Sequence, residues 1–384
     1  MKTGSYPVQK LSMKISVTIA RIIVGVLFIF SGLVKAIDPL GLTYKMQEFF
    51  EVWARDGYAV TLMNWLYGQS FVFSIIIISI EVVLGVALLV GFKKKSVLAF
   101  LLLLMIFFTF LTSYVLFSGK IATCGCFGDC IPLTPIQTFT KDILLLLLIV
   151  FLLFNQQYIT PLSKNIIPST LVLFSIIAVM ILQLHVIKHL PLKDCLPFKV
   201  GNDLLKLRQM PVDAIPDKFD YNFVYQKNGI KKDFTTSQLP DSSWNFVERK
   251  QILLQKGKNN VPRINDFSLT DSTGADVTEA LLSQNKGYYL FFIKDFVESP
   301  SKWIDDFKAF VQRAKQKNLS VYIVTADREG AIRLLNNINK FDLQIFTCDA
   351  TAIKTAARAN PTLFFMQGAV VQNKYSWADI NKMK

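Results

Sequence analysis

Five long, almost uncharged apolar runs fill the first half of the chain. A run of about 18 or more such residues is long enough to cross the hydrocarbon core of a bilayer as a helix. With 52% hydrophobic residues, the chain carries more apolar surface than a soluble core of this size needs. The class is therefore an α-helical membrane protein held in a lipid bilayer. We expect the spans at 15–37, 71–92, 96–118, 143–160 and 167–187.

The composition becomes ordinary and polar after about residue 188, which indicates a second, non-membrane part. That part is long enough to bury a core of its own. We expect four units along the chain. They are a transmembrane four-helix bundle at 1–165, a fifth transmembrane helix at 166–189, a small β-rich connector at 190–261 and a folded domain at 262–384.

Lysines in the short loops predict the direction of the spans. Three lysines precede the first span, and Lys93 to Lys95 fill the turn between the second and third. Because short cytoplasmic loops carry an excess of lysine and arginine, the N-terminus should be cytoplasmic. Five spans then place the C-terminal half on the opposite side. In a bacterial cell this predicts an inner-membrane protein with a periplasmic C-terminal domain.

The formal net charge of +14 does not indicate nucleic-acid binding. Basic membrane proteins commonly owe their excess to topology and to contact with anionic lipid. No block of basic residues with interleaved aromatic residues is present, so nucleic acid is not an expected partner.

Ionisable residues inside the spans are costly and need partners. Glu81 falls in the second span, and we predict that it pairs with Arg21 of the first span. Lys35 and Asp38 should lie nearer the outer interface. The pair could fix only the helix register, or it could form a polar floor for a small ligand such as a quinone.

Four cysteines are expected at one membrane face. Cys124, Cys126 and Cys130 lie in the loop "TCGCFGDCIP", and Cys195 follows the fifth span. Three interpretations stay open. The sulfurs could exchange disulfides with a partner, form a structural bridge, most simply from Cys130 to Cys195, or bind a metal, although neither histidine stands in a recognisable ligand repeat.

Within the redox interpretation, spacing separates two roles. A disulfide between Cys124 and Cys126 would be strained and easy to open, which favours exchange. Closing so small a loop removes little conformational entropy from the unfolded chain, so the bridge would stabilise the fold only slightly. This disfavours a structural role. Cys130 and Cys195 are then the expected relay or staple, and Asp129 should disfavour a thiolate at Cys130.

The first half resembles the DoxX-like and MauE-like families of small membrane proteins. The resemblance covers about 12–160 and rests on "ARIIVGVLFIFSGLVKAIDPLG", on Glu81 in the second span and on "CGCFG" before the fourth. It implies a four-helix bundle connected to periplasmic thiol or quinone redox chemistry, and for MauE-like proteins an association with methylamine utilisation. Quinone is the cofactor class that it brings into consideration.

Beyond the spans, alternating patterns predict strands. "YNFVYQ", the turn "KNG" and "IKKDFT" predict a hairpin, which "WNFVERKQILL" follows. "GYYLFFIKDF" and "LSVYIVTAD" predict buried strands, "SPSKWIDDFKAFVQRAKQK" an amphipathic helix between them, and "PTLFFMQGAVVQNKYSW" a final hairpin.

This order of elements resembles the thioredoxin and peroxiredoxin-like superfamily over 262–384. "ANPTLFF" matches the superfamily's proline element and makes Pro361 the candidate cis proline. Where the superfamily carries Cys-x-x-Cys, the chain has Glu298, Ser299 and Pro300 in "KDFVESPSKW". The resemblance therefore implies an α/β thioredoxin-like domain without its dithiol. Cys348 lies at the other end of the domain's sequence and is expected to be an ordinary small residue, with a reactive thiol as the alternative.

Together these features predict a membrane component of periplasmic thiol–disulfide chemistry that acts on a periplasmic thiol protein. A second hypothesis is a non-catalytic scaffold or assembly factor, with structural disulfides and a docking thioredoxin-like domain.

Overall fold

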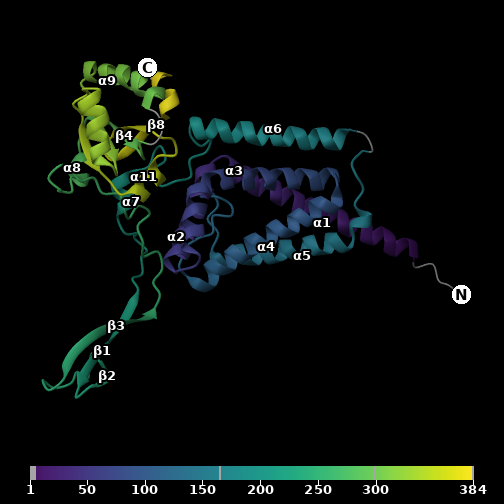
Figure 1. Ribbon diagram of the computed structural model, residues 1–384, viewed down its shortest axis with the longest axis horizontal. Helices are drawn as coiled ribbons and strands as arrows, with labels where there is room; N and C mark the ends of the chain where they lie inside the picture. Colours follow the sequence, from purple (N-terminus) through teal and green to yellow (C-terminus); the bar gives the residue numbers. More distant parts are fainter. Residues whose placement is uncertain (1–5, 164–165, 297–299, 383–384) are drawn as a thin grey trace.

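The computed structural model describes residues 6–163, 166–296 and 300–382. It shows a bundle of long helices, an α/β domain at one end of the bundle, and a three-stranded sheet that extends away from both (Figure 1). The predicted fold class, a membrane helical bundle followed by an α/β domain, is confirmed.

Five helices are long and apolar enough to cross a membrane, the number expected from the sequence. Many of their outward side chains, such as Ile19, Phe100 and Leu144, are large, apolar and exposed, which suits contact with lipid. The helices are α1 (Tyr6–Ala36), α3 (Val60–Val90), α4 (Lys94–Ser118), α5 (Pro135–Phe154) and α6 (Ile167–Lys188).

Helices α1 and α3 pack closely through small residues. A Cβ atom on Gly85 would lie 2.8 Å from the carbonyl oxygen of Gly25, so a larger residue would push the helices apart. Such close approach is the usual basis of helix association in a bilayer, where burial from water contributes nothing. The contact fixes the antiparallel register of the two helices by placing residue 25 opposite residue 85.

Helix α2 (Pro39–Arg55) was not expected from the sequence. It contains charged residues and is too short to span a bilayer, so a search for apolar runs passes over it. Pro39 stands in its first turn, where a proline costs no hydrogen bond. The helix lies across the end of the bundle that faces the α/β domain (Figure 1).

The predicted hairpin forms two strands of an antiparallel sheet with the order β2-β1-β3. Lys227 pairs with Ile230, and Asn228 and Gly229 between them both have positive φ, as a tight two-residue hairpin turn requires. The sheet extends from the rest of the molecule like an arm (Figure 1). Its strands are β1 (Lys218–Lys227), β2 (Ile230–Thr235) and β3 (Asn245–Gln255).

The α/β domain contains a five-stranded sheet with the order β6-β5-β4-β7-β8. Strands β4, β5 and β6 are parallel, whereas β7 and β8 pair antiparallel. The final hairpin turns at Gly368, as expected. The strands are β4 (Gly287–Ile293), β5 (Ser320–Thr325), β6 (Gln344–Thr347), β7 (Thr362–Gln367) and β8 (Val370–Ser376).

Both faces of this sheet are buried, which explains why β4 reads as a continuous apolar run. Phe291 stacks on Phe307 on one face, and Phe292 packs with Phe364 on the other. The segment just after the membrane, with Phe198, joins the second core. The remaining helical elements are η1 (Gln156–Tyr158), α7 (Leu204–Arg208), α8 (Thr278–Leu282), η2 (Pro300–Lys302), α9 (Ile304–Gln316), α10 (Arg328–Ala331), the π-helical η3 (Ile332–Ile338), α11 (Ala350–Ala356) and η4 (Trp377–Lys382).

Candidate functional site: a dithiol at the end of the membrane bundle

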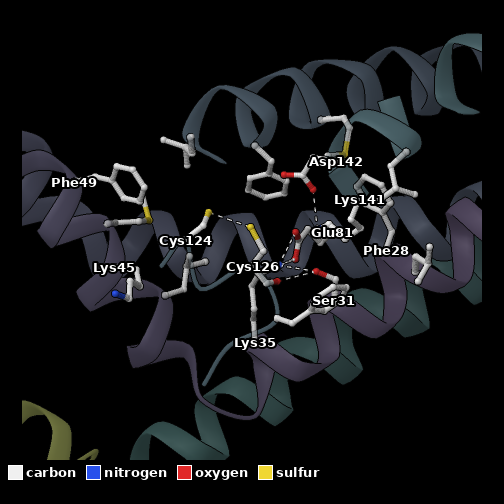
Figure 2. Close-up of a pocket in the computed structure, with 18 residues that line it drawn as sticks. Phe28, Ser31, Lys35, Lys45, Phe49, Glu81, Cys124, Cys126, Lys141 and Asp142 are labelled. Carbon is white, nitrogen blue, oxygen red and sulfur yellow. Dashed lines mark hydrogen bonds and ion pairs between the residues drawn. The ribbon is translucent and has the colours of Figure 1, made fainter. Parts of the chain in front are cut away.

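The loop between α4 and α5 brings two cysteines together at the end of the bundle. Gly125 stands between Cys124 and Cys126 with a φ of 69°, a conformation that other residues rarely adopt. The Ser31 hydroxyl of α1 donates a hydrogen bond to the Cys126 carbonyl and holds the loop against the bundle. The two sulfurs point toward one another (Figure 2), 3.0 Å apart and not bridged.

The surroundings of the two thiols differ. Cys124 packs beside the apolar side chains of α2 and α4, whereas Cys126 faces the charged groups of Lys141 and Lys35. The hydrogen bond between the sulfurs lowers the pKa of Cys126, and the positive charge of Lys141 lowers it further. Burial acts in the opposite direction and does not outweigh these two effects. The same hydrogen bond and burial raise the pKa of Cys124. Cys126 is therefore the thiol that ionises first.

The two cysteines line a cavity together with side chains from α1, α2, α3, α4 and α5 (Figure 2). Its volume is about 40 Å³, which exceeds the ~10–15 Å³ that one water requires. Sites for small-molecule ligands have volumes of about 300–1,000 Å³. The cavity therefore has room for a few waters, and a quinone would need it to widen.

The floor of the cavity is an ion pair inside the membrane. Lys35 Nζ lies 2.6 Å from Glu81 Oε2 and also donates to the Ser31 hydroxyl. The side chains of Lys35 and Glu81 are only 3% and 2% exposed, so each charge depends on the other.

The predicted pair between Arg21 and Glu81 is wrong. Because Gly25 faces Gly85, Arg21 lies opposite Leu89, eight residues or about 12 Å beyond Glu81 along α3. Its guanidinium instead donates to three carbonyl oxygens at the far end of the bundle, those of Leu88, Leu89 and Thr160. Lys35 was expected near the interface and occupies the place predicted for Arg21.

Two charged residues of the site were missed by the sequence reasoning. Lys141 and Asp142 are the seventh and eighth residues of α5, and their charged atoms lie 2.8 Å apart. Asp142 is fully buried and accepts a hydrogen bond from the Thr112 hydroxyl of α4. The sequence signal for these residues was their position directly before the apolar run "ILLLLLIVFLLF". Because the fourth span was expected to begin at residue 143, the two charges were placed outside the membrane helix.

The other two cysteines of the membrane face form a disulfide between Cys130 and Cys195. This is the simplest of the bridges that the sequence allowed. It joins the dithiol loop to the segment that leads from α6 into the α/β domain.

The α/β domain contacts the bundle through a buried arginine. Arg358 Nε lies 2.9 Å from Asp38 Oδ2, and its Nη2 lies 3.0 Å from Asp129 Oδ2. Burial raises the pKa of the Asp38 carboxyl, and the Arg358 guanidinium opposes this effect. Asp38, expected at the interface, thus has a partner 320 residues away along the chain, and Asp129 belongs to the dithiol loop.

Inside the α/β domain, the peptide bond before Pro361 is cis. Of the residues expected in place of a dithiol, Glu298 and Ser299 lie outside the described residues, and Pro300 begins η2. Cys348 is buried beside β6 in the domain core, and this burial raises its pKa to about 12.

These environments predict an order of alkylation by iodoacetamide as the pH rises. Cys126 should react first, and Cys124 and Cys348 more slowly, because the thiolate is the reactive form. At about pH 8 a thiol with a pKa of 12 is ionised in only ~1 molecule in 10⁴. Mass spectrometry of the peptides measures each rate, and in SDS the three cysteines should react alike. Equal rates for Cys348 and Cys126 in the folded protein would contradict the assignment.

The fold and the site define an integral membrane protein with a polytopic helical bundle and a dithiol loop at one end. Residues 13–155 match the family described as methylamine utilisation protein MauE. The match runs from within α1 to the end of α5 and includes every cysteine of the loop.

Two further comparisons apply to parts of the chain. Residues 219–256, the three-stranded sheet, match a domain of unknown function. Protein TlpB of Flavobacterium psychrophilum is 33% identical over 140 residues, which are 35% of this chain and 35% of that protein. The chain thus matches about a third of the length of this relative. No solved structure matches the chain.

Proposed function

We propose that the protein is a membrane component of thiol–disulfide exchange, in which Cys124 and Cys126 are the reacting pair. The observation that carries the proposal is the unbridged pair of sulfurs 3.0 Å apart at a charged cavity. The neighbouring Cys130–Cys195 disulfide serves as the staple. A strained bridge between residues two apart would open readily, as a disulfide that is passed on must.

In one direction, the Cys126 thiolate attacks a disulfide of a partner protein, and one partner sulfur leaves as a thiolate. Cys124 then loses its proton and attacks the Cys126 sulfur of the mixed disulfide, which releases the second partner sulfur. The partner gains two electrons and two protons, and the pair becomes a disulfide. In reverse, the pair passes its disulfide to a partner dithiol, and the relative reduction potentials set the direction. A quinone takes part in none of these steps.

We propose further that the protein lies in a bacterial inner membrane, with its N-terminus cytoplasmic and its α/β domain periplasmic. The lysine-rich turn at Lys93 to Lys95 supports this direction. The dithiol loop, α2 and the α/β domain lie together at the opposite end of the bundle (Figure 1). The partner would then be a periplasmic thiol protein, in a compartment where disulfides persist.

We infer that the α/β domain is thioredoxin-like and has no dithiol activity of its own. Its strand order supports the first part. The buried position of Cys348 supports the second. A docking role is favoured by the contacts that hold the domain to the bundle, which also include the pairs His189–Asp379 and Lys374–Asp194.

Trapping of mixed disulfides tests the proposed function. In cells that carry Cys124→Ser, a partner attached to Cys126 cannot be released by the second cysteine, so adducts should accumulate. Cys126→Ser should accumulate fewer, because Cys124 is the weaker nucleophile. Acid-quenched membranes run on non-reducing gels, followed by mass spectrometry, identify the attached protein.

The matched control is Cys348→Ser, which should leave the adduct pattern unchanged. If neither variant forms adducts, and if the double variant leaves every periplasmic disulfide intact, the exchange function is excluded. The scaffold function, with Cys130–Cys195 as a structural bridge, would then be the better account.

A further inference from the structure

A second, larger cavity lies where the α/β domain meets the bundle. Its volume is about 750 Å³, within the ~300–1,000 Å³ of ligand sites. Its walls come from α2, from the first half of α3, from the end of α6 and from the α/β domain. Lys294 directly follows the central strand β4, at the carboxyl edge of the sheet where α/β folds commonly bind ligands.

The lining of this cavity is strongly cationic. Among the residues that the structure describes, five lysine and arginine side chains line it against one carboxylate, that of Asp295. Arg358 is already neutralised by its two aspartates. The four lysines do not all have a carboxylate partner of this kind. The five are Lys188, Lys294, Lys302, Lys354 and Arg358.

Three of these lysines have no carboxylate within 4 Å in the described part of the chain. Lys294 donates to the Tyr44 hydroxyl at 3.2 Å, a neutral partner. Lys354 lies over the Tyr44 ring, and Lys188 over the Trp377 ring. Three uncompensated positive charges around one cavity attract an anion.

The position of the cavity indicates what kind of anion can reach it. Lys188 is the last residue of the membrane helix α6, so one side of the cavity lies at headgroup depth. Phe71 of α3 is exposed, and Tyr67, Tyr44 and Trp377 add aromatic walls of the kind found at membrane interfaces. An occupant can thus place an anionic group among the lysines and apolar chains along the helices.

We propose that this cavity binds a phosphate group, supplied by the headgroup of an anionic phospholipid. Lys294 and Lys354 donate to the phosphate oxygens, and Lys188 adds its charge at the membrane side. Free phosphate shares this chemistry and is the other source that can be tested. The site lies outside the dithiol cavity and is independent of thiol exchange.

Native mass spectrometry of the full chain tests the proposal. The protein, purified in detergent, is mixed with phosphatidylglycerol or with phosphatidylcholine, and the bound lipid is counted. We expect phosphatidylglycerol to bind and the double variant Lys294→Gln/Lys354→Gln to bind it at least ~10-fold more weakly, because two charged donors are removed. The control variant, Lys308→Gln/Lys315→Gln, removes two exposed lysines from α9 in the same domain and should bind normally.

A competition arm with inorganic phosphate separates the two sources. Displacement by millimolar phosphate supports a site that also accepts free phosphate, whereas no displacement supports the lipid alone. The proposal is overturned if the cavity variant binds as the unmodified protein does, or if the control variant loses as much binding. A thermal melt of each variant, expected to match the unmodified protein, shows that the fold is kept.

Discussion

Replacing Glu81 by leucine is expected to lower the free energy of unfolding in detergent by about 3–5 kcal/mol. The substitution leaves the Lys35 ammonium, 3% exposed, without its partner in a medium of low dielectric. Replacing both residues, as Lys35→Met with Glu81→Leu, should be much milder, because no charge then stays buried. Unfolding in SDS, followed by circular dichroism, measures all three variants.

The chain contains a matched control for burial. Lys45 and Glu48 form a pair at 2.7 Å, but their side chains are 24% and 37% exposed. Glu48→Leu should change stability by at most about 1 kcal/mol, as surface pairs do. A double variant at Lys35 and Glu81 that costs as much as the two single variants combined would show that the two charges do not depend on each other.

Replacing Arg358 by methionine should release the α/β domain from the bundle. The change leaves Asp38 without its charge partner, at a cost of about 2–5 kcal/mol. The loss of the pair with Asp38 should account for more of this cost than the loss of the pair with Asp129. The Asp38 side chain is 18% exposed, whereas that of Asp129 is 38% exposed. The Cys130–Cys195 bridge still connects the domain to the dithiol loop, so we expect the domain to move relative to the bundle and to stay attached to it.

Hydrogen exchange measures this release. In Arg358→Met, protection should fall in α2, in the dithiol loop and in the segment 350–360, while the domain core around β4 keeps its protection. Arg333→Met removes an exposed arginine from the same domain and serves as the control. Unchanged exchange in α2 and the loop would show that Arg358 does not hold the two parts together.

The elements of this fold could largely be predicted from local patterns. The five spans follow from the length of the apolar runs, and the hairpin around Asn228 follows from alternation and a turn signal. Helix α2 was missed because it neither spans the membrane nor carries a strong apolar run. Each of these outcomes depends on residues close together in the chain.

The partners within the site could not be predicted in the same way. Hydropathy gives the depth of Glu81 along its span but neither the rotation nor the register of the helices, which the contact of Gly25 with Gly85 fixes. Arg358 contacts Asp38 across 320 residues, and no local pattern carries that information. The bridge from Cys130 to Cys195 could be named as one of the open interpretations, because few sulfurs are available on that face.

The Cys130–Cys195 disulfide also imposes an order on the biosynthesis of the chain. The two cysteines are 65 residues apart, and the last two membrane helices lie between them. At ~5–20 residues per second, Cys195 is synthesised about 3–13 s after Cys130. Throughout that interval the nearest thiols to Cys130 are Cys124 and Cys126, so a nascent chain that oxidised too early would join sulfurs that the finished protein keeps apart.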